Sequence, residues 1–584
     1  MPDKVVGKVR RRQRAVAGEL GVVDRSTSFE SGKGREFVYN VFENTSCLVD
    51  MDEEPPHEIN MEAVESALRL SSAFSAHVPD EIEPMRKEVV DGSDPSAFQR
   101  SMMVGHDGFV EAGGRKIGIT SVFLEEESSG IESSSEDFVI YNVDRLGVPL
   151  IEIDTGPDIK SPEEAKQVAL KIGMLLRLTG RKEDGFARAE VQRGIGTIRQ
   201  DVNVSIEGGT RVEVKGLQQI DGVDLIIENE VARQVKLLEI KKDLASRKAS
   251  VGDPVDVSDL FAATAAKMLR NSIDSGNAVM AAGLPGFAGA IGVELGPGRR
   301  LGSEISDYAK MAGVKGIIHS DEDLDKYGIT AAEAESLRSR LGIGADGAFM
   351  LVTAKKEICI KAMKLACDRA RMAMSEVPPE TRAVLDAEKG TTRFMRPLPG
   401  GSRMYPETDA NPIKVGKDLY KSILDTTIYA EERMGRIRKG LQNQQLAEQL
   451  ISSPRLPMYE YVTSKSKCDR LVIAATILEK LKELERSGTE VDMKEDVMVD
   501  IFDRYGRGEI TKAGIGEIIK GMPRSASDVD SAIAKKSLAR ISGDRLKELV
   551  EGMHGKAKGD VMREVMSKYR LNVDGEELRS MLGV

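Results

Sequence analysis

Residues 198–206 read IRQDVNVSI, and this alternation of polar and apolar residues decides how the first half of the chain is interpreted. Successive side chains of a β-strand point to opposite faces of its sheet. Arg199, Asp201 and Asn203 would therefore share one face, and Val202 and Val204 would share the other. The pattern predicts a sheet with one polar and one apolar face.

Acidic residues recur in other strand-like stretches on both sides of this segment. The stretches are LEEE at 124–127, PLIEI at 149–153 and RVEVKG at 211–216. Glu152 lies between two isoleucines, and Glu213 and Lys215 alternate with valines. Two interpretations stay open, because the solvated face of an antiparallel sheet is polar by necessity, whereas carboxylates with Asn, Arg and Lys also suit a site for Mg²⁺ and phosphate. Spacing does not decide between them.

The length and residue pattern of the chain predict several domains. A chain of 584 residues exceeds what one hydrophobic core usually supports. Ser161 and Pro162 mark a helix start, as N-cap and first helical residue. We expect an α+β fold with the following parts: a mixed, sheet-containing domain at 1–251 that continues at 385–415, an inserted α/β domain at 252–384, a helical domain at 416–510 and a helical tail at 511–584.

The composition limits the classes of protein to which this chain can belong. No apolar run is long enough to span a bilayer, and the basic N-terminus has no apolar stretch after it, so we expect a cytoplasmic protein that is neither membrane-bound nor secreted. The net charge of −11 argues against coating of nucleic acid, although a local basic face can still hold phosphates. The four cysteines form no CxxC pair, which excludes a disulfide framework or a cysteine zinc site.

Read in order, these segments resemble the amidotransferase B/E family over almost the whole chain. The shared motifs are LEEE at 124–127, PLIEI at 149–153, SPEEA at 161–165, IRQDVNVS at 198–205 and EVK at 213–215. The stretch LPGFAGAIG at 284–292 resembles a domain inserted in bacterial aspartyl-tRNA synthetases, which distinguishes the E branch of the family from the B branch. The stretch RPLPGGSRMYPETD at 396–409 is also typical of the E branch.

The resemblance implies a reaction in two steps. ATP would phosphorylate the γ-carboxylate of glutamate mischarged on tRNA(Gln), and ammonia would then displace phosphate, with Mg²⁺ neutralising charge. Members of the E branch take ammonia from a separate asparaginase-like glutaminase, called the D subunit, with a dimer of heterodimers as the expected assembly. Since no cysteine has an evident histidine partner, we expect no glutaminase nucleophile in this chain. The tail at 511–584 would bind glutamyl-tRNA(Gln).

The resemblance also assigns residues to roles. The implied metal ligands are Glu126 and Glu152, with Glu125 as an adjacent candidate. The implied catalytic residues, which line the phosphate site, are Arg199, Asp201, Asn203, Glu213 and Lys215. The residues in segments that match a nucleotide-binding site are Lys87, Gln99, Arg403 and Glu407, for which a purely structural role is the alternative.

One departure from the family pattern leaves alternatives open. Family members begin with a strand of the form GLEIH, whose Glu and His complete the metal site, and that sequence does not occur here. We therefore expect a segment before Met1, from a misassigned start or a truncation. A protein without that strand would instead be a non-catalytic tRNA-binding or assembly protein of the same fold. A relative of aspartyl-tRNA synthetase is the other alternative, but no class II aminoacylation core is visible.

Overall fold

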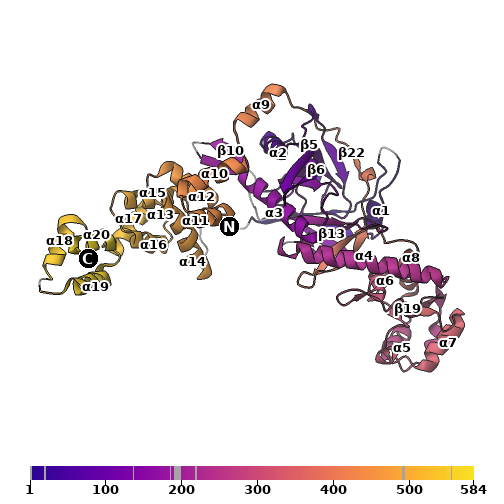
Figure 1. The fold of residues 1–584 in the computed structure, drawn as a ribbon. Coiled ribbons are helices and arrows are strands. Elements are labelled where there is room, and N and C mark those ends of the chain that lie inside the picture. Colours follow the sequence, from indigo (N-terminus) through magenta and orange to yellow (C-terminus); the bar gives the residue numbers. More distant parts are fainter. Residues whose placement is uncertain are drawn as a thin grey trace. The chain divides into compact units, whose positions relative to one another are not determined.

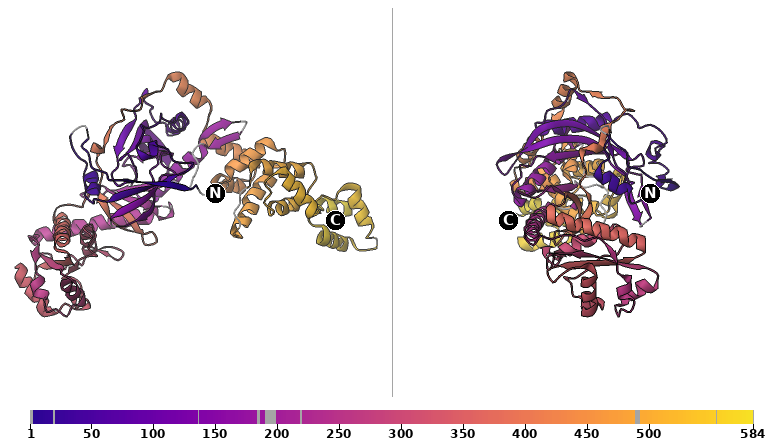
Figure 2. Two further views of the ribbon diagram at one scale, coloured as in Figure 1. Left: turned by 180° about the vertical axis from the view of Figure 1, so that it is seen from behind. Right: turned by 90° about the vertical axis from the view of Figure 1, so that its right-hand side faces the viewer.

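The computed structural model describes residues 3–18, 21–135, 137–183, 186–189, 199–217, 220–488, 493–553 and 555–583. The chain divides into two compact units. Unit 1 consists of Met1–Gly173 and Arg193–Lys417, and unit 2 consists of Met174–Gln192 and Asp418–Val584. Most of the sheets lie in unit 1, whereas unit 2 is mainly helical (Figure 1), as two further views also show (Figure 2).

The central sheet of unit 1 is antiparallel throughout. Its strands, in sheet order, are β22 (Met404–Pro406), β4 (Met85–Glu88), β5 (Phe98–Ala112), β6 (Arg115–Glu126) and β9 (Pro149–Thr155). Gly113 and Gly114 connect β5 to β6 with φ angles of 57° and 76°. Two successive positive φ angles are what a two-residue hairpin turn needs, and glycine adopts them without steric cost.

Helix α2 (Met61–Ala73) covers one face of this sheet, with Asn60 capping its first turn. Met102 and Leu124 lie directly opposite each other on β5 and β6 and are almost completely buried on that face. The chain approaches β5 so closely after the helix that a Cβ at Gly108 would lie 2.7 Å from the carbonyl oxygen of Phe74. The packed face leaves the opposite face of the sheet for polar side chains.

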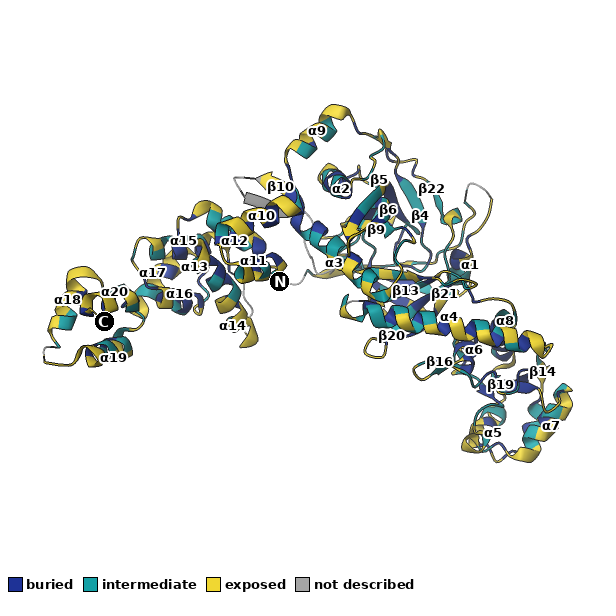
Figure 3. Ribbon diagram, in the orientation of Figure 1, coloured by how far each residue is buried: buried dark blue, intermediate teal, exposed yellow. Residues whose placement is uncertain are grey.

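A second, four-stranded sheet carries the alternating segments of the sequence. Its strands, in sheet order, are β12 (Gln200–Val204), β13 (Val212–Leu217), β20 (Glu380–Asp386) and β21 (Thr391–Pro397). Val212 and Val214 are fully buried in a hydrophobic cluster with α4 (Val223–Ser246) and α8 (Lys356–Ser375). Helix α4 alternates buried and exposed residues along its length, as expected of a helix with one packed face (Figure 3). Strand β13 pairs with β20 in parallel, which joins two segments far apart in the sequence.

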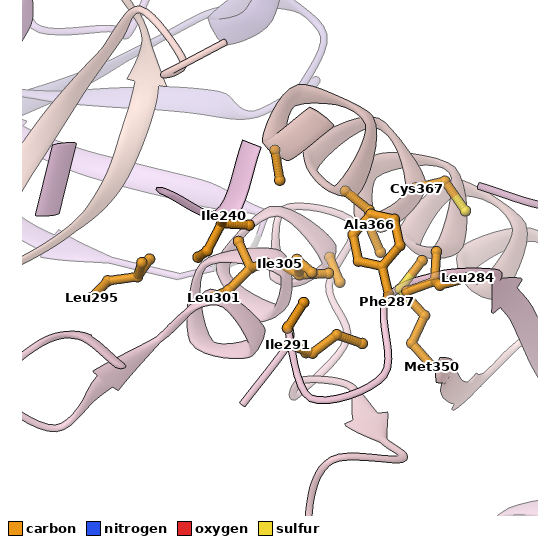
Figure 4. Close-up of a cluster of buried hydrophobic side chains, with 14 of the residues drawn as sticks. Ile240, Leu284, Phe287, Ile291, Leu295, Leu301, Ile305, Met350, Ala366 and Cys367 are labelled. Atoms are coloured by element: carbon orange, nitrogen blue, oxygen red, sulfur yellow. The ribbon is translucent and has the colours of Figure 1, made fainter. Parts of the chain in front are cut away.

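Between α4 and β20 the chain builds a further sheet in the order β14 (Val255–Asp256), β15 (Ala278–Leu284), β19 (Ala348–Ala354) and β18 (Ile318–His319). Both faces of β15 are buried. Met280 and Ala282 belong to the cluster with α4 and α8, part of which Figure 4 shows, whereas Val279 and Ala281 belong to a second cluster. Helices α5 (Lys267–Asp274), α6 (Leu301–Lys310) and α7 (Ala331–Leu341) complete this segment.

The N-terminal sheet of unit 1 is smaller. Its strands, in sheet order, are β1 (Val5–Arg11), β2 (Glu36–Phe42), β8 (Phe138–Asn142) and β7 (Gly130–Ser134), and α1 (Arg25–Ser31) lies between β1 and β2 in the chain. Tyr39 and Tyr141 stack in its core with ring centroids 5.8 Å apart. Their hydroxyls donate to the carbonyl oxygens of Gly92 and Asp91, which fixes the loop between β4 and β5.

Unit 2 begins with a short sheet in which β10 (Gly180–Glu183) pairs with β11 (Phe186–Ala189) and β24 (Thr427–Ile428). From α10 (Ala430–Leu441) onward the described chain is a series of helices. Arg433 is 1% exposed and binds the carboxylate of Glu460 on α12 (Leu456–Lys465). The last helices, α18 (Gly543–Glu551), α19 (Lys558–Tyr569) and α20 (Gly575–Leu582), share a hydrophobic cluster of their own.

These features confirm an α+β fold followed by a helical C-terminal region. Helix α3 (Pro162–Leu178) starts where the sequence predicted, and the Ser161 hydroxyl accepts a hydrogen bond from the backbone N–H of Glu164. The boundaries of the insert at 252–384, and of the helical parts at 416–510 and 511–584, stay predictions. Within the described ranges, no helix has the length and apolar character that a membrane crossing requires.

Candidate active site on the central sheet

Four of the predicted site residues lie on one face of the central sheet, opposite the face that α2 covers. Lys87 is paired across the strands with Gln99, and Glu152 with Phe123. Glu125 is paired with Ser101, two residues beyond Gln99 on β5. Residues directly opposite each other, and residues two apart on one strand, project from the same face. We call the face that carries Lys87, Gln99, Glu125 and Glu152 the polar face.

The centre of the polar face is an ammonium group between two carboxylates. Lys87 Nζ lies 2.6 Å from Glu125 Oε1 and 3.7 Å from Glu152 Oε2. The hydroxyl of Ser101 donates to the same Glu125 oxygen at 2.9 Å. The Glu125 side chain is 4% exposed, whereas that of Glu152 is 46% exposed. The face therefore presents one buried carboxylate with two hydrogen-bond donors on one oxygen and one accessible carboxylate.

Glu152 is electrostatically strained in this position. Desolvation, and then repulsion from Glu125, raise the pKa of Glu152 to about 7, and the charge of Lys87 opposes that rise. The carboxylate therefore gains from any further positive charge that reaches it. Its partly exposed position leaves room for a ligand to supply that charge.

A second polar group lies on β12 and β13. Asn203 is paired directly with Glu213 across the two strands, so these side chains share a face. Lys215 Nζ lies 2.5 Å from Asp201 Oδ2 and 3.3 Å from Glu213 Oε1. Burial alone would raise the pKa of Glu213, but Lys215 and the hydroxyl of Thr381 hold that pKa below its ordinary value. The ammonium of Lys215 is thus held between two ionised carboxylates.

Arg403 connects the two polar groups electrostatically. It lies directly before β22, and its guanidinium interacts with the charges of Glu125 on the central sheet and of Glu213 on the second sheet. Burial, and then repulsion from Arg396, lower the pKa of Arg403. Among the described residues, no carboxylate oxygen lies within 4 Å of Arg403. A half-buried guanidinium without a close counter-ion is suited to bind phosphate oxygens.

An ion pair also joins the two sheets. Arg199, directly before β12, binds the carboxylate of Glu127, directly after β6. The backbone N–H of Glu127 donates to the carbonyl oxygen of Val148 at the start of β9. The ends of β6, β9 and β12 therefore meet at one place, and the two polar groups belong to one site.

Glu126 and Glu407 are not brought to the polar face. Glu126 follows Glu125 on β6 and binds Arg100 on the opposite face of the sheet, at 3.0 Å from the Arg100 Nε. Glu407 is buried and accepts two hydrogen bonds from Arg86, of 2.9 and 2.6 Å. Gln99 lies on the polar face, but its amide donates to the backbone carbonyl of Glu126 at 2.6 Å. In this arrangement the carboxylates that share one space are Glu125 and Glu152.

The donor chemistry of that pair suits Mg²⁺. In the described part of the chain, no three His, Cys, Asp or Glu side chains gather as a ready-made metal site. Mg²⁺ differs from most protein-bound metals because it is commonly held by one or two carboxylates and completes its shell with water and substrate phosphates. Two carboxylates, one of them accessible and short of positive charge, meet that requirement.

Some features of the site were missed by sequence reasoning. Ser101, Thr381 and Arg396 are not acids between apolar neighbours, which was the signal used. The expectation that no cysteine has a histidine partner is wrong, because Cys47 Sγ lies 3.8 Å from His57 Nε2. Both residues are exposed and ten residues apart in a loop region, where no strand or helix periodicity could have paired them.

Comparison with known proteins gives a consistent result. Residues 31–421 match the family described as the GatB/GatE catalytic domain. The chain is 39% identical to the E subunit of glutamyl-tRNA(Gln) amidotransferase from Methanocaldococcus jannaschii, over 99% of this chain and 93% of that protein. It is also 39% identical to the protein of the same name from Aeropyrum pernix, over 97% of this chain and 90% of that protein. For the protein of the same name from Haloarcula marismortui, the identity is 38%, over 97% and 90% of the two chains.

Proposed function

The chain belongs to the family of glutamyl-tRNA(Gln) amidotransferase E subunits, within the GatB/GatE group, and we propose that it converts glutamate on tRNA(Gln) into glutamine with ATP and ammonia. Family membership makes it part of a ligase-type tRNA amidotransferase. The observation that carries the finer proposal is the polar face, where Lys87 lies beside the accessible carboxylate of Glu152, together with Lys215 on the second sheet and Arg403, whose charge acts on both polar groups.

The chemistry of the proposed reaction explains this mixture of charges. A carboxylate resists attack by ammonia until one of its oxygens becomes a good leaving group, and transfer of the terminal phosphoryl group of ATP provides one. Phosphoryl transfer then depends on positioning and on neutralising negative charge. Lys215 and Arg403 would bind phosphate oxygens, and Arg199, whose side chain is 60% exposed beside Glu127, would join them.

Glu125 and Glu152 would hold Mg²⁺ beside these cations. When bound, the ion neutralises phosphate charge and orients the nucleotide. Lys87 supplies the positive charge between the two carboxylates in this structure, at 2.6 and 3.7 Å. Its flexible side chain would also be available to bind phosphate oxygens. Asp201 and Glu213 would keep the Lys215 ammonium directed at the same phosphates.

We further propose the partners that this reaction needs. An asparaginase-like glutaminase, the D subunit, would supply ammonia, in a dimer of heterodimers. The segment at 252–384 would correspond to the insert of bacterial aspartyl-tRNA synthetases, and the helical tail at 511–584 would bind tRNA. Support for a separate tail comes from the hydrophobic cluster that the last three helices share, because such a cluster lets them fold as a unit.

The test is the conversion of glutamyl-tRNA(Gln) to glutaminyl-tRNA(Gln) by the full chain, with Mg²⁺ and either ammonium or glutamine as nitrogen donor. We expect conversion with ATP and ammonium, and none with glutamine alone. Absence of both conversion and substrate-dependent ATP cleavage, in a chain that still binds tRNA, would favour the non-catalytic tRNA-binding protein. Conversion with glutamine alone would mean that this chain holds a glutaminase site, and Cys47 beside His57 would be the first place to look.

A further inference from the structure

Strand β20 contributes one side-chain hydroxyl to the candidate site. Thr381 is paired with Glu213 in the parallel ladder of β20 and β13, and its Oγ1 donates to Glu213 Oε2 at 2.7 Å. The Thr381 side chain is completely buried. Glu213 is the partner of this hydroxyl among the described residues, and Glu213 in turn binds Lys215. The Thr381 hydroxyl therefore reaches the Lys215 ammonium only through the Glu213 carboxylate.

The presence of a hydroxyl at this position needs a reason. Valine has the same shape as threonine and suits a buried strand at least as well. A buried hydroxyl costs free energy unless it forms a hydrogen bond, and this one forms its bond to an ionised carboxylate. Because the side chain is β-branched, its χ1 angle is restricted, so the hydroxyl is held in one direction. Thr381 therefore offers Glu213 a donor that hardly moves.

The other face of β20 is anchored by buried ion pairs. Glu380 and Arg382 flank Thr381, and both point away from it into a network with side chains from three helices. Arg233 on α4 lies 2.7 Å from Glu380 and 2.5 Å from Glu304 on α6. Arg382 lies 3.2 Å from Glu304. These buried ion pairs join β20 to the helices, and loss of one partner would leave a buried charge uncompensated.

Polar or charged groups from several neighbouring elements face Glu213. Lys215 lies on the same strand, and Asn203 lies opposite on β12. Arg396 on β21 and Arg403 before β22 act on it electrostatically. With several cations within reach, the Glu213 carboxylate has alternative partners, and a fixed donor decides which way it turns.

We propose that Thr381 is a positioning residue for the amidation site: its hydroxyl fixes the Glu213 carboxylate, and through it the Lys215 ammonium, in the orientation that meets the substrate phosphate. The inference rests on the proposed function, because it assigns Lys215 to phosphate. Thr381 itself touches no substrate in this account. Its effect passes through the ion pair between Glu213 and Lys215.

The variants that test this are Thr381→Val, which removes only the hydroxyl, and Thr381→Ser, which keeps it. Partners of this kind typically change activity by about 10–100-fold. With ATP, ammonium and glutamyl-tRNA(Gln), we expect kcat of the Val variant to fall in that range, with little change in KM for tRNA, and the Ser variant to recover most of it. Thr264→Val is the matched control, because Thr264 is a buried threonine in the inserted segment whose hydroxyl also forms a hydrogen bond. It should keep wild-type kcat.

A second measurement does not depend on turnover. The side chain of Lys215 is 31% exposed, so it can react with an amine-modifying reagent while the protein is folded. The extent of modification can then be measured by mass spectrometry. We expect faster modification of Lys215 in the Val variant than in the wild type and in the Ser variant. Unchanged modification, wild-type kcat in the Val variant, or equal loss in the Ser and Val variants would each overturn the inference. A wild-type protein without turnover would instead count against the proposed function, and the modification rates would still decide the role of Thr381.

Discussion

The ammonium of Lys87 lies 2.6 Å from the buried carboxylate of Glu125 and only 3.7 Å from the accessible carboxylate of Glu152. Glu125 also accepts a hydrogen bond from Ser101, so its charge is well compensated. Lys87 lies farther from Glu152, and desolvation together with repulsion from Glu125 raises the pKa of Glu152 to about 7. The two carboxylates differ in environment, and we expect their removal to have different consequences.

Glu152→Gln should lower amidation at saturating Mg²⁺ by about 100-fold or more, because it removes the charge proposed to hold the metal while keeping volume and polarity. Stability should respond in the opposite direction. The folded-state pKa is raised above the ordinary value of 4.5, so ionised Glu152 disfavours folding above about pH 7. We expect the metal-free melting temperature at pH 8 to be equal or higher in the variant.

Glu111→Gln is the control for that experiment, because Glu111 is an exposed glutamate on β5 of the same sheet. It should change neither turnover nor the melting temperature. Near-normal turnover in Glu152→Gln would remove Glu152 from the site and leave the polar face as an ordinary solvated surface.

Asp94→Asn should stabilise the protein at alkaline pH. Asp94 is 3% exposed, and desolvation raises its pKa from 3.8 to about 7, against the hydrogen bond from Ser128. The folded state therefore binds a proton that the unfolded state has lost between these two values, so stability falls as pH rises from about 4 to about 7. The upper bound of this effect is about 4 kcal/mol. Calorimetry at pH 5 and pH 8 should show a larger gain in stability of the variant over the wild type at pH 8 than at pH 5.

The comparison variant is Asp274→Asn, whose side chain is 67% exposed in the inserted segment. Its stability difference from the wild type should be the same at both pH values. An Asp94→Asn variant with a constant difference as well would contradict the raised pKa of Asp94.

Glu304→Gln should destabilise unit 1 by about 3–5 kcal/mol, because it leaves buried arginines without their counter-charge. Burial alone would raise the pKa of Glu304, but Arg233, Arg382 and Arg369 hold it well below 4.5. The contribution of this lowered pKa is thus complete above about pH 4.5 and is lost as pH falls through the folded-state value. Urea titrations should show a large difference in the free energy of unfolding between the wild type and the variant at pH 7, and a smaller difference at acidic pH.

An exposed ion pair provides the contrast. Glu432 binds Arg436 one helical turn away, with side chains 42% and 55% exposed. Glu432→Gln should cost no more than about 0.5 kcal/mol. A Glu304→Gln variant as mild as this one would show that the buried network does not anchor β20.

Deletion of residues 541–584 should weaken binding of tRNA(Gln) without unfolding unit 1. The last three helices have their own hydrophobic cluster, so a cut before Ile541 removes it whole. A cut at 456 would instead remove Glu460, the partner of the buried Arg433. Binding can be measured by filter retention, with the unit 1 melting transition as the control. Unchanged affinity would refute a tRNA-binding role for the tail.

Much of the fold could be predicted because its signals are local. The alternation around Asp201 and Val202 identified a two-faced strand, and Ser161 and Pro162 located the start of α3, since both depend only on neighbouring residues. The family motifs likewise lie in continuous stretches. The parallel pairing of β13 with β20 lay beyond such signals, because the two strands are separated by the whole inserted segment.

Within the site, the sequence by itself determined which residue types were available: the acids of LEEE and PLIEI, and the lysine and arginines around them. Only the tertiary structure decided which of them meet. Adjacent Glu125 and Glu126 look equivalent in sequence, yet strand alternation and pairing send one to Lys87 and the other to Arg100. The physical reason is that the partner of a charged side chain lies on another strand or another sheet. Which partner it meets depends on the hydrogen-bond register of the strands and on burial, and the spacing of residues along one chain segment specifies neither the register nor the burial.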